Sequence, residues 1–227
     1  MQVPVEQTII LSLKIALAAV AFNTPFCLFV GWYLARRQFR GKTLIETLVN
    51  MPLVVPPVVT GYFLLIVFGR KGLLGQWLYA ATGLALSFSW QAAALAAAVV
   101  SFPLFANAVR VAIENVDPRL EEAARVLRAG RWRVYLQVTL PLSMNGIAAG
   151  LFLCFARSLG EFGATIMVAG NIPGRTQTIP LAIYSLVNQA DEQQALILVG
   201  ISILISYASL FAGQVLQRRW QGRKTHE

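Results

Sequence analysis

The sequence predicts an all-α integral membrane protein that crosses the bilayer about five times. Of its 227 residues, 57% are hydrophobic and only 13% are charged, and its mean hydropathy is +0.63. These values are too apolar for an ordinary soluble domain, so a soluble protein with several buried helices is the disfavoured alternative. The hydrophobic residues also occur in long runs, and a helix needs about 20 apolar residues to cross about 30 Å of hydrocarbon. Because backbone amides inside lipid must bond within their own segment, such runs are expected to be helical.

Five apolar runs account for the predicted spans, and with their connections they form one transmembrane domain over residues 7–216. A basic tail at 217–227 follows the last of the runs, which cover approximately residues 9–35, 44–68, 90–113, 141–169 and 195–216. Pro56 and Pro57 interrupt the second run. Because proline removes an amide donor and clashes with the previous turn, we expect a kinked or broken helix there. Such a break fits a helix that lines a water-filled pathway, or a kink that only improves packing. Residues 178–188 could re-enter the membrane, but about 11 residues are too few to cross it.

The positive charges lie in the gaps between the apolar runs. A net charge of +9 would by itself allow nucleic-acid binding. However, most of the 19 lysines and arginines fall in three groups, at 36–42, 110–133 and 218–224. Because cytoplasmic loops carry the excess of basic residues, this grouping predicts an odd number of spans, with the N-terminus outside and the C-terminus in the cytoplasm. We therefore expect a multi-pass protein in contact with lipid and not with nucleic acid.

The longest predicted cytoplasmic segment, residues 115–140, contains a short helix that lies outside the membrane. Asp117 is a favourable N-cap, and Pro118 suits the first helical position. Gly130 can adopt the left-handed conformation that ends a helix. Taken alone, this pattern is equally compatible with a simple solvated loop helix.

This segment resembles the cytoplasmic loop of the membrane subunits of binding-protein-dependent ABC importers. The match lies in Glu122-Ala123-Ala124 and in the later stretch Val138-Thr139-Leu140-Pro141, whereas the family's glycine falls on Arg128. Gly130 is expected to take over the turn that this glycine makes. The resemblance implies a type I ABC importer transmembrane domain and a coupling helix that seats in a groove of an ATPase subunit. The residues expected to couple to the ATPase are Glu122, Ala123, Ala124, Arg125, Leu127 and Gly130.

The fourth run narrows the resemblance to the oxyanion branch of that family. The stretches 155–165 and 170–174 are most similar to molybdate permease subunits, with sulfate and thiosulfate permeases next. This resemblance implies molybdate as the transported ion, with tungstate, sulfate and thiosulfate as alternatives. It also implies location in a prokaryotic plasma (inner) membrane.

Arg157 and Glu161 are the charged residues of the fourth run. Charges inside a membrane are costly, so they normally face the interior of a helix bundle or a wet cavity. At positions i and i+4 the two side chains share a helix face and can neutralise one another, which also allows a purely structural ion pair. In the functional interpretation Arg157 is a positive element beside the anion route, and Glu161 limits how tightly an anion binds. The residues expected to line the translocation pathway are Arg157, Ser158, Glu161, Thr165, Pro56 and Pro57.

The sequence contains no nucleotide-binding loop of its own. Gly41-Lys42-Thr43 resembles the end of such a loop, but Arg36 occupies the position of its first glycine. We therefore expect no cofactor in this chain, with ATP and Mg²⁺ bound by two copies of a partner ATPase subunit. The other expected partners are a second copy of this chain and an external substrate-binding protein that delivers the oxyanion.

Two other classes of membrane protein are disfavoured. A membrane-embedded enzyme would need a catalytic set within the bilayer. The predicted spans contain no histidine, and Glu161 is their only carboxylate away from the span ends, since Glu46 lies at the start of the second run, so no catalytic or metal-binding residues are predicted. An ion-gradient-driven carrier would usually show repeated halves and ionisable relays. Neither is visible in the sequence.

Overall fold

Every regular element in the computed structural model is a helix over the residues that it describes, 5–83 and 86–224, which confirms the predicted all-α class. The elements, in chain order, are α1 (Val5–Arg36), α2 (Lys42–Val54), α3 (Pro57–Phe68), α4 (Gly75–Thr82), α5 (Trp90–Glu114), α6 (Pro118–Val126), α7 (Arg131–Val134), the π-helical turn η1 (Tyr135–Thr139), α8 (Leu140–Leu159), α9 (Gly163–Ala169), α10 (Ile179–Asn188) and α11 (Glu192–Lys224).

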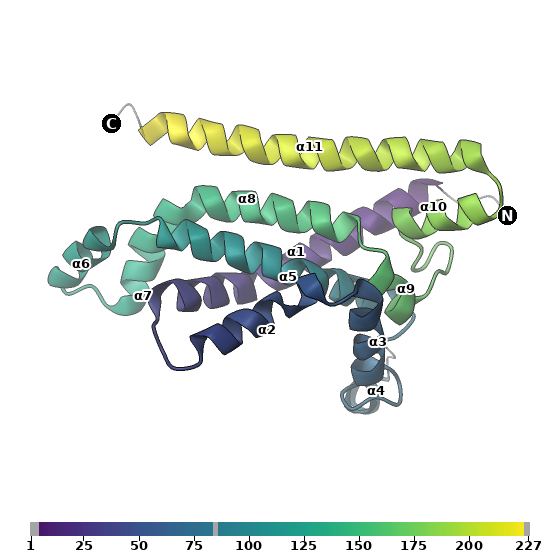
Figure 1. The fold of residues 1–227 in the computed structure, drawn as a ribbon, viewed down its shortest axis with the longest axis horizontal. Coiled ribbons are helices and arrows are strands. Elements are labelled where there is room, and N and C mark those ends of the chain that lie inside the picture. Colours follow the sequence, from purple (N-terminus) through teal and green to yellow (C-terminus); the bar gives the residue numbers. More distant parts are fainter. Residues whose placement is uncertain (1–4, 84–85, 225–227) are drawn as a thin grey trace.

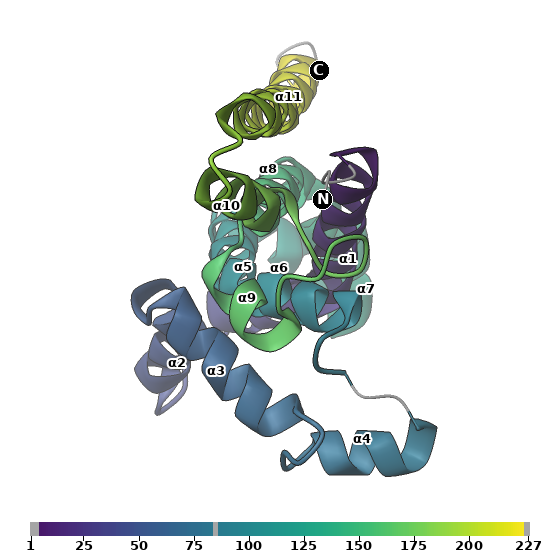
Figure 2. The same ribbon diagram turned by 90° about the vertical axis from the view of Figure 1, so that its right-hand side faces the viewer.

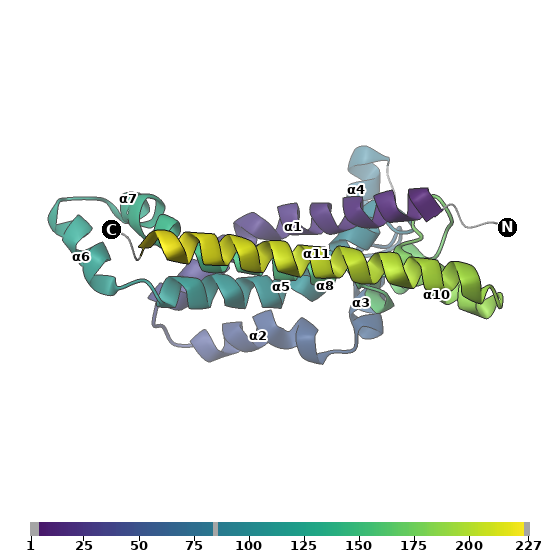
Figure 3. The same cartoon turned by 90° about the horizontal axis from the view of Figure 1, so that it is seen from above.

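The long helices lie side by side along one axis (Figures 1 and 3). Four continuous helical segments are long and apolar enough to cross a membrane, and the bent pair α2 and α3 raises the number to five. This agrees with the prediction of about five spans. Helices α6 and α7 lie at one end of the bundle, and the start of α1 lies at the other, beside α10 (Figure 1). Which end faces the cytoplasm stays a prediction.

Helix α5 forms the centre of the bundle. In its most apolar stretch of 18 residues 67% of the residues are buried, against 28% for α1. The first half of α5 is rich in alanine, and small side chains allow neighbouring helices to approach closely. The side-chain amide of Asn23, on α1, donates to the Ala98 carbonyl oxygen at 2.9 Å and to Ser101 Oγ at 3.2 Å, so a buried polar contact adds to this packing.

The second predicted span is broken at its prolines, as expected. Helix α2 ends at Val54, Pro57 is the first residue of α3, and the two helices meet at an angle of 109°. Because neither Pro56 nor Pro57 has an amide hydrogen, the helical ladder cannot continue through them. Helix α3 therefore projects sideways and carries α4 at its tip, instead of continuing along the bundle axis (Figure 2).

The fourth and fifth predicted spans differ from the observed helices. The fourth was expected as one helix over 141–169. Instead, helical structure already begins at Arg131, stops at Leu159, and resumes as α9 after a break at Gly160–Phe162. The last helix continues to Lys224, so the predicted tail at 217–227 begins as helix, and residues 225–227 lie outside the described part. Helix α10 packs against α1 and α11, and its Ile179 amide donates to Ser12 Oγ at 2.9 Å.

Candidate functional site

Helix α6 begins as its sequence predicts. Asp117 is the N-cap, and its Oδ1 accepts a hydrogen bond from the Arg119 amide at 2.9 Å. Pro118 occupies the first turn, where its missing amide hydrogen would have had no helical partner anyway. The segment is therefore a true helix at the end of the bundle rather than an irregular loop (Figure 1).

The turn that ends α6 is made by Arg128, so the prediction for Gly130 was wrong. Arg128 has a φ of 59°, and Gly130 has extended backbone and precedes α7. The Ala129 amide donates to the Ala124 carbonyl at 3.1 Å, and the Arg128 amide donates to the Arg125 carbonyl at 2.9 Å. This pair of bonds defines a Schellman motif, in which the residue after the C-cap must be left-handed. The left-handed residue is therefore Arg128, at the position where the importer family has glycine. It is not Gly130, which was expected to make the turn.

Replacing Arg128 with glycine is expected to stabilise the α6 turn by about 1 kcal/mol. A left-handed conformation costs a residue with a Cβ roughly 1–2 kcal/mol, and glycine returns part of this through its greater freedom in the unfolded chain. Thermal unfolding of the detergent-solubilised chain would measure the gain. Gly130→Ala is the matched comparison: because its φ is −66° and a Cβ there has nothing within 4 Å, removing glycine at that position should not lower the melting temperature. A lower melting temperature for Arg128→Gly would contradict this account of the turn.

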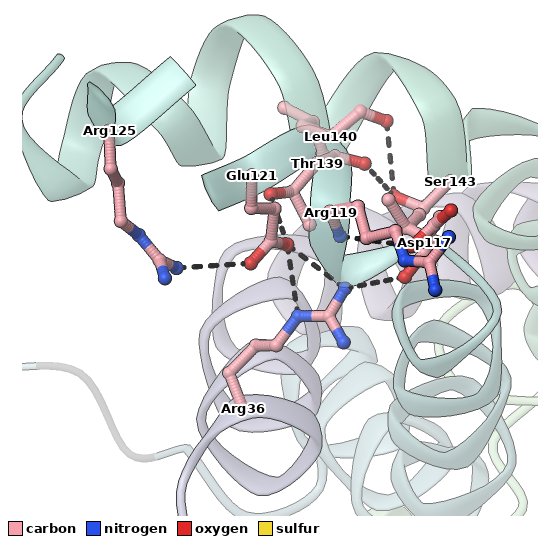
Figure 4. Close-up of polar contacts among 9 residues, drawn as sticks. Arg36, Asp117, Arg119, Glu121, Arg125, Thr139, Leu140 and Ser143 are labelled. Carbon is pink, nitrogen blue, oxygen red and sulfur yellow. Dashed lines mark hydrogen bonds and ion pairs between the residues drawn. The ribbon is translucent and has the colours of Figure 1, made fainter. Parts of the chain in front are cut away.

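Glu121 connects α6 to α1 and η1 through hydrogen bonds and ion pairs (Figure 4). Its Oε1 lies 2.9 Å from Arg36 Nε at the end of α1 and accepts a hydrogen bond from Thr139 Oγ1 at 2.8 Å. Its Oε2 lies 3.2 Å from Arg125 Nη2. Arg36 also donates to the Val116 carbonyl at 3.0 Å. The Glu121 side chain is only 5% exposed, so one buried carboxylate joins α1, α6 and η1.

Glu121 was missed by the sequence reasoning, which selected its neighbour Glu122. Successive residues of a helix point about 100° apart, so the two carboxylates face different surroundings: Glu121 is buried, and Glu122 is exposed. One signal was available, the spacing of four residues between Glu121 and Arg125, which predicts a helical ion pair. The decisive partners, Arg36 and Thr139, are distant in sequence.

The side of α6 that faces away from Glu121 exposes apolar side chains next to charged ones. Leu120 is 49% exposed, and Val126 and Leu127 are each 82% exposed. We call Leu120, Glu122, Val126 and Leu127 the docking face. Of the other predicted coupling residues, Ala123 and Arg125 are also exposed, and Ala124 is half-buried. Apolar side chains this exposed on a charged helix favour contact with another protein.

A second candidate region lies where two interrupted helices meet. A Cβ added to Gly163, at the start of α9, would lie 3.1 Å from Pro57 Cβ. A Cβ added to Gly61, on α3, would lie 2.5 Å from the Ala164 carbonyl oxygen. The breaks in the second and fourth predicted spans are thus packed against each other. Interrupted helices within a membrane are typical of substrate sites and pathways.

Arg157 and Glu161 form the predicted ion pair at this junction, although not on one helix. Arg157 Nη2 lies 2.9 Å from Glu161 Oε2, but α8 ends at Leu159. Glu161 Oε1 accepts a hydrogen bond from the Ala164 amide at 2.8 Å and so caps α9. The Glu161 side chain is 2% exposed and both of its oxygens are engaged, whereas Arg157 remains 30% exposed. Glu161 therefore positions the break, and Arg157 keeps accessible positive charge.

Of the other predicted pathway residues, two are buried and one is exposed. Ser158 is buried and donates to Ser101 Oγ at 3.1 Å, so its hydroxyl joins α8 to α5. Thr165 is also buried, on α9. Pro56 is exposed at the elbow, and Pro57 packs against Gly163.

These features define a class of protein: a polytopic membrane protein whose spans contain an interrupted junction and whose end carries a short helix with exposed apolar side chains. The chain belongs to the family of binding-protein-dependent transport system inner membrane components, whose pattern matches residues 27–222. This membership confirms the resemblance predicted from the loop motif and places the chain in the inner membrane as a transport component rather than an enzyme.

Individual relatives are similar over nearly the whole chain. The molybdenum transport system permease protein ModB of Escherichia coli K12 is 50% identical over 95% of this chain and 94% of its own length. The ModB protein of Haemophilus influenzae is 49% identical over 93% of each chain. The sulfate transport system permease protein CysT of Escherichia coli K12 is 36% identical over 92% of this chain and 75% of its own length.

Solved structures share the fold. A bacterial ABC transporter involved in the import of alginate superposes with a TM-score of 0.72 at 19% identity, over 96% of this chain and 80% of that one. The inward-facing MetNI methionine ABC transporter gives a TM-score of 0.71 at 17% identity, over 96% of this chain and 99% of that one. The predicted type I importer fold is thereby confirmed.

Proposed function

We propose that this chain is the permease subunit of an ATP-driven importer for molybdate. The observation that carries the proposal is the difference in identity, 50% to a molybdenum permease against 36% to a sulfate permease. The first of the two stretches from which the oxyanion branch was predicted, 155–165, contains the Arg157–Glu161 pair, at the junction of the two interrupted spans. A positive group there suits a tetrahedral anion, and its pairing with Glu161 keeps the attraction moderate enough for release.

The proposed assembly contains two copies of this chain, two ATPase subunits that bind ATP and Mg²⁺, and an external binding protein that delivers the anion. The docking face of α6 would seat in a groove of the ATPase subunit, because it offers apolar side chains for burial and Glu122 for a charge contact. This arrangement puts α6 and the end of α11 in the cytoplasm and the start of α1 outside.

Glu121 provides the proposed route from ATP hydrolysis to the membrane helices. A displacement of α6 pulls on α1 through Arg36 and on η1 through Thr139. The π-helical turn η1 leads directly into α8, which ends at the Arg157 junction. Because π-helical turns inside α-helices are frequent at functional sites, η1 is a suitable point for this helix to change conformation.

Arg157→Ala is expected to reduce molybdate uptake at least tenfold, since the accessible positive charge at the junction is lost, while Arg157→Lys should retain a larger share. Uptake of radiolabelled molybdate by vesicles would be normalised to the amount of assembled transporter. Arg175→Ala, which removes an exposed arginine from the 170–178 connection, is the control and should transport normally. Unchanged uptake by Arg157→Ala would leave the ion pair with a structural role only.

Uptake in cells that lack this chain tests the proposed substrate. Deletion should abolish high-affinity uptake of radiolabelled molybdate and leave sulfate uptake unchanged, and a plasmid copy should restore molybdate uptake. Competition by unlabelled tungstate, sulfate and thiosulfate would rank the alternative anions. Loss of sulfate uptake with normal molybdate uptake would overturn the assignment in favour of a sulfate permease.

A further inference from the structure

The end of the bundle that carries α6 contains a cavity of about 290 Å³ beside the Glu121 contacts. Since a water molecule occupies about 30 Å³, the cavity has room for roughly ten waters, or for a small polar group. Residues from α1, α6, α7 and η1 line it, together with Arg37 just after α1: Trp32, Arg36, Arg37, Glu121, Arg125, Arg131, Val134, Tyr135 and Thr139.

Positive charge exceeds negative charge in this cavity. Four arginines line it, and Glu121 is the one carboxylate among the lining residues. Glu121 is already engaged by Arg36 and Arg125. Over the described part of the chain, no carboxylate pairs with Arg37 or Arg131, which lie exposed at the rim. Planar guanidinium groups arranged in this way suit the oxygens of a phosphate.

The aromatic residues at the cavity, Trp32 and Tyr135, are of the types found at the level of the lipid headgroups. The Trp32 ring lies 5.5 Å from the Tyr135 ring and 5.9 Å from the Trp132 ring, measured between centroids. Tryptophan and tyrosine concentrate at membrane–water interfaces, and the cavity lies at the end of α1, a helix long and apolar enough to span. Basic pockets between helices at this level bind anionic headgroups.

We propose that this cavity binds a phosphate-type anion, supplied by the headgroup of an anionic phospholipid such as phosphatidylglycerol or by free phosphate. The bound group would contact Arg37, just after α1, and Arg131, at the start of α7, so occupancy would join these two elements at the α6 end of the bundle. The proposal needs only that the long helices span a lipid bilayer, and it does not depend on the substrate of the transporter.

Native mass spectrometry of the full-length chain in detergent tests the proposal, with phosphatidylglycerol and phosphatidylcholine titrated separately. Phosphatidylglycerol should bind preferentially, and Arg37→Gln with Arg131→Gln should weaken its binding roughly 25-fold. Arg119→Gln with Arg133→Gln is the matched control, since it removes the same charge from arginines of the same end that do not line the cavity, and it should bind like the wild type. A second arm measures whether inorganic phosphate raises the melting temperature.

The outcomes separate the sources of the anion. Preferential binding of phosphatidylglycerol that is lost only in the rim variant supports a headgroup site. Stabilisation by inorganic phosphate without lipid preference, again lost only in the rim variant, supports a free-anion site. Equal binding by the rim and control variants would overturn the proposal. Loss of ATPase binding in the rim variant, with no change in lipid or phosphate binding, would also overturn it and assign the cavity to the protein interface.

Discussion

Glu121→Ala is expected to uncouple the transporter, so that ATP hydrolysis continues while molybdate uptake falls to a small fraction of the wild-type rate. Removing this carboxylate leaves Arg36, half-buried at the end of α1, without its charge partner and takes the acceptor from Thr139. Breaking a buried pair by removing one member typically costs about 3 kcal/mol. Such a loss would detach α6 from α1 and η1 about a hundred times more often, so motion of the ATPase would no longer reach the membrane helices.

The measurement is the ratio of molybdate transported to ATP hydrolysed by transporters reconstituted in liposomes. Glu6→Ala is the matched control, because Glu6 is exposed at the start of α1, at the opposite end of the bundle from α6 (Figure 1), and forms no ion pair in the described part of the chain. A double-mutant cycle with Arg36→Ala separates coupling from general damage. Adding Glu121→Ala to Arg36→Ala should cost much less than it costs in the wild type. Full additivity, or a normal transport ratio for Glu121→Ala, would remove Glu121 from the coupling route.

Leu127→Asp is expected to prevent stable association with the ATPase subunit without affecting insertion of the chain into the membrane. Leu127 is 82% exposed, so an aspartate there costs the isolated chain little, whereas a charge without a partner at the centre of an apolar contact is costly. Central contact residues typically contribute 2 kcal/mol or more, so affinity should fall at least about thirtyfold.

Co-purification of the ATPase subunit with the tagged chain would measure this loss. Leu73→Asp is the control, since Leu73 is 78% exposed but lies between α3 and α4, far from α6 (Figure 1). Charge reversal by Glu122→Lys should weaken association less and should uncouple hydrolysis from uptake. Normal recovery of the ATPase with Leu127→Asp would show that the docking face lies elsewhere.

The features that could be predicted from sequence are those that local chemistry decides. Runs of apolar residues predicted the spanning helices. Pro56 and Pro57 predicted the break between α2 and α3, and Asp117 predicted the start of α6. Each of these depends on a few adjacent residues, because hydrogen-bond donors, caps and hydrophobic length are local properties.

The features that could not be predicted depend on contacts between distant segments. Glu122 was chosen over Glu121 because motif resemblance marks a position, whereas burial beside Arg36 is a product of folding. The break after Leu159 was missed because glycine is common within membrane helices, so Gly160 and Gly163 did not indicate an interruption. The contact between Pro57 and Gly163 is formed only in the folded chain. The left-handed turn was assigned to Gly130 because glycine adopts that conformation most easily, but the hydrogen bonds of the helix end require it at Arg128.

The central claim, that α6 is a cytosolic docking helix for an ATPase subunit, is tested most directly by labelling a single exposed cysteine. The native Cys27 and Cys154 are buried, so Leu127→Cys provides the reactive thiol. A membrane-impermeant maleimide should fail to label it in intact spheroplasts. It should label it in inverted vesicles stripped of the ATPase, and lose that labelling when the ATPase is added back. Labelling from outside the cell, or equal labelling with and without the ATPase, would contradict the claim.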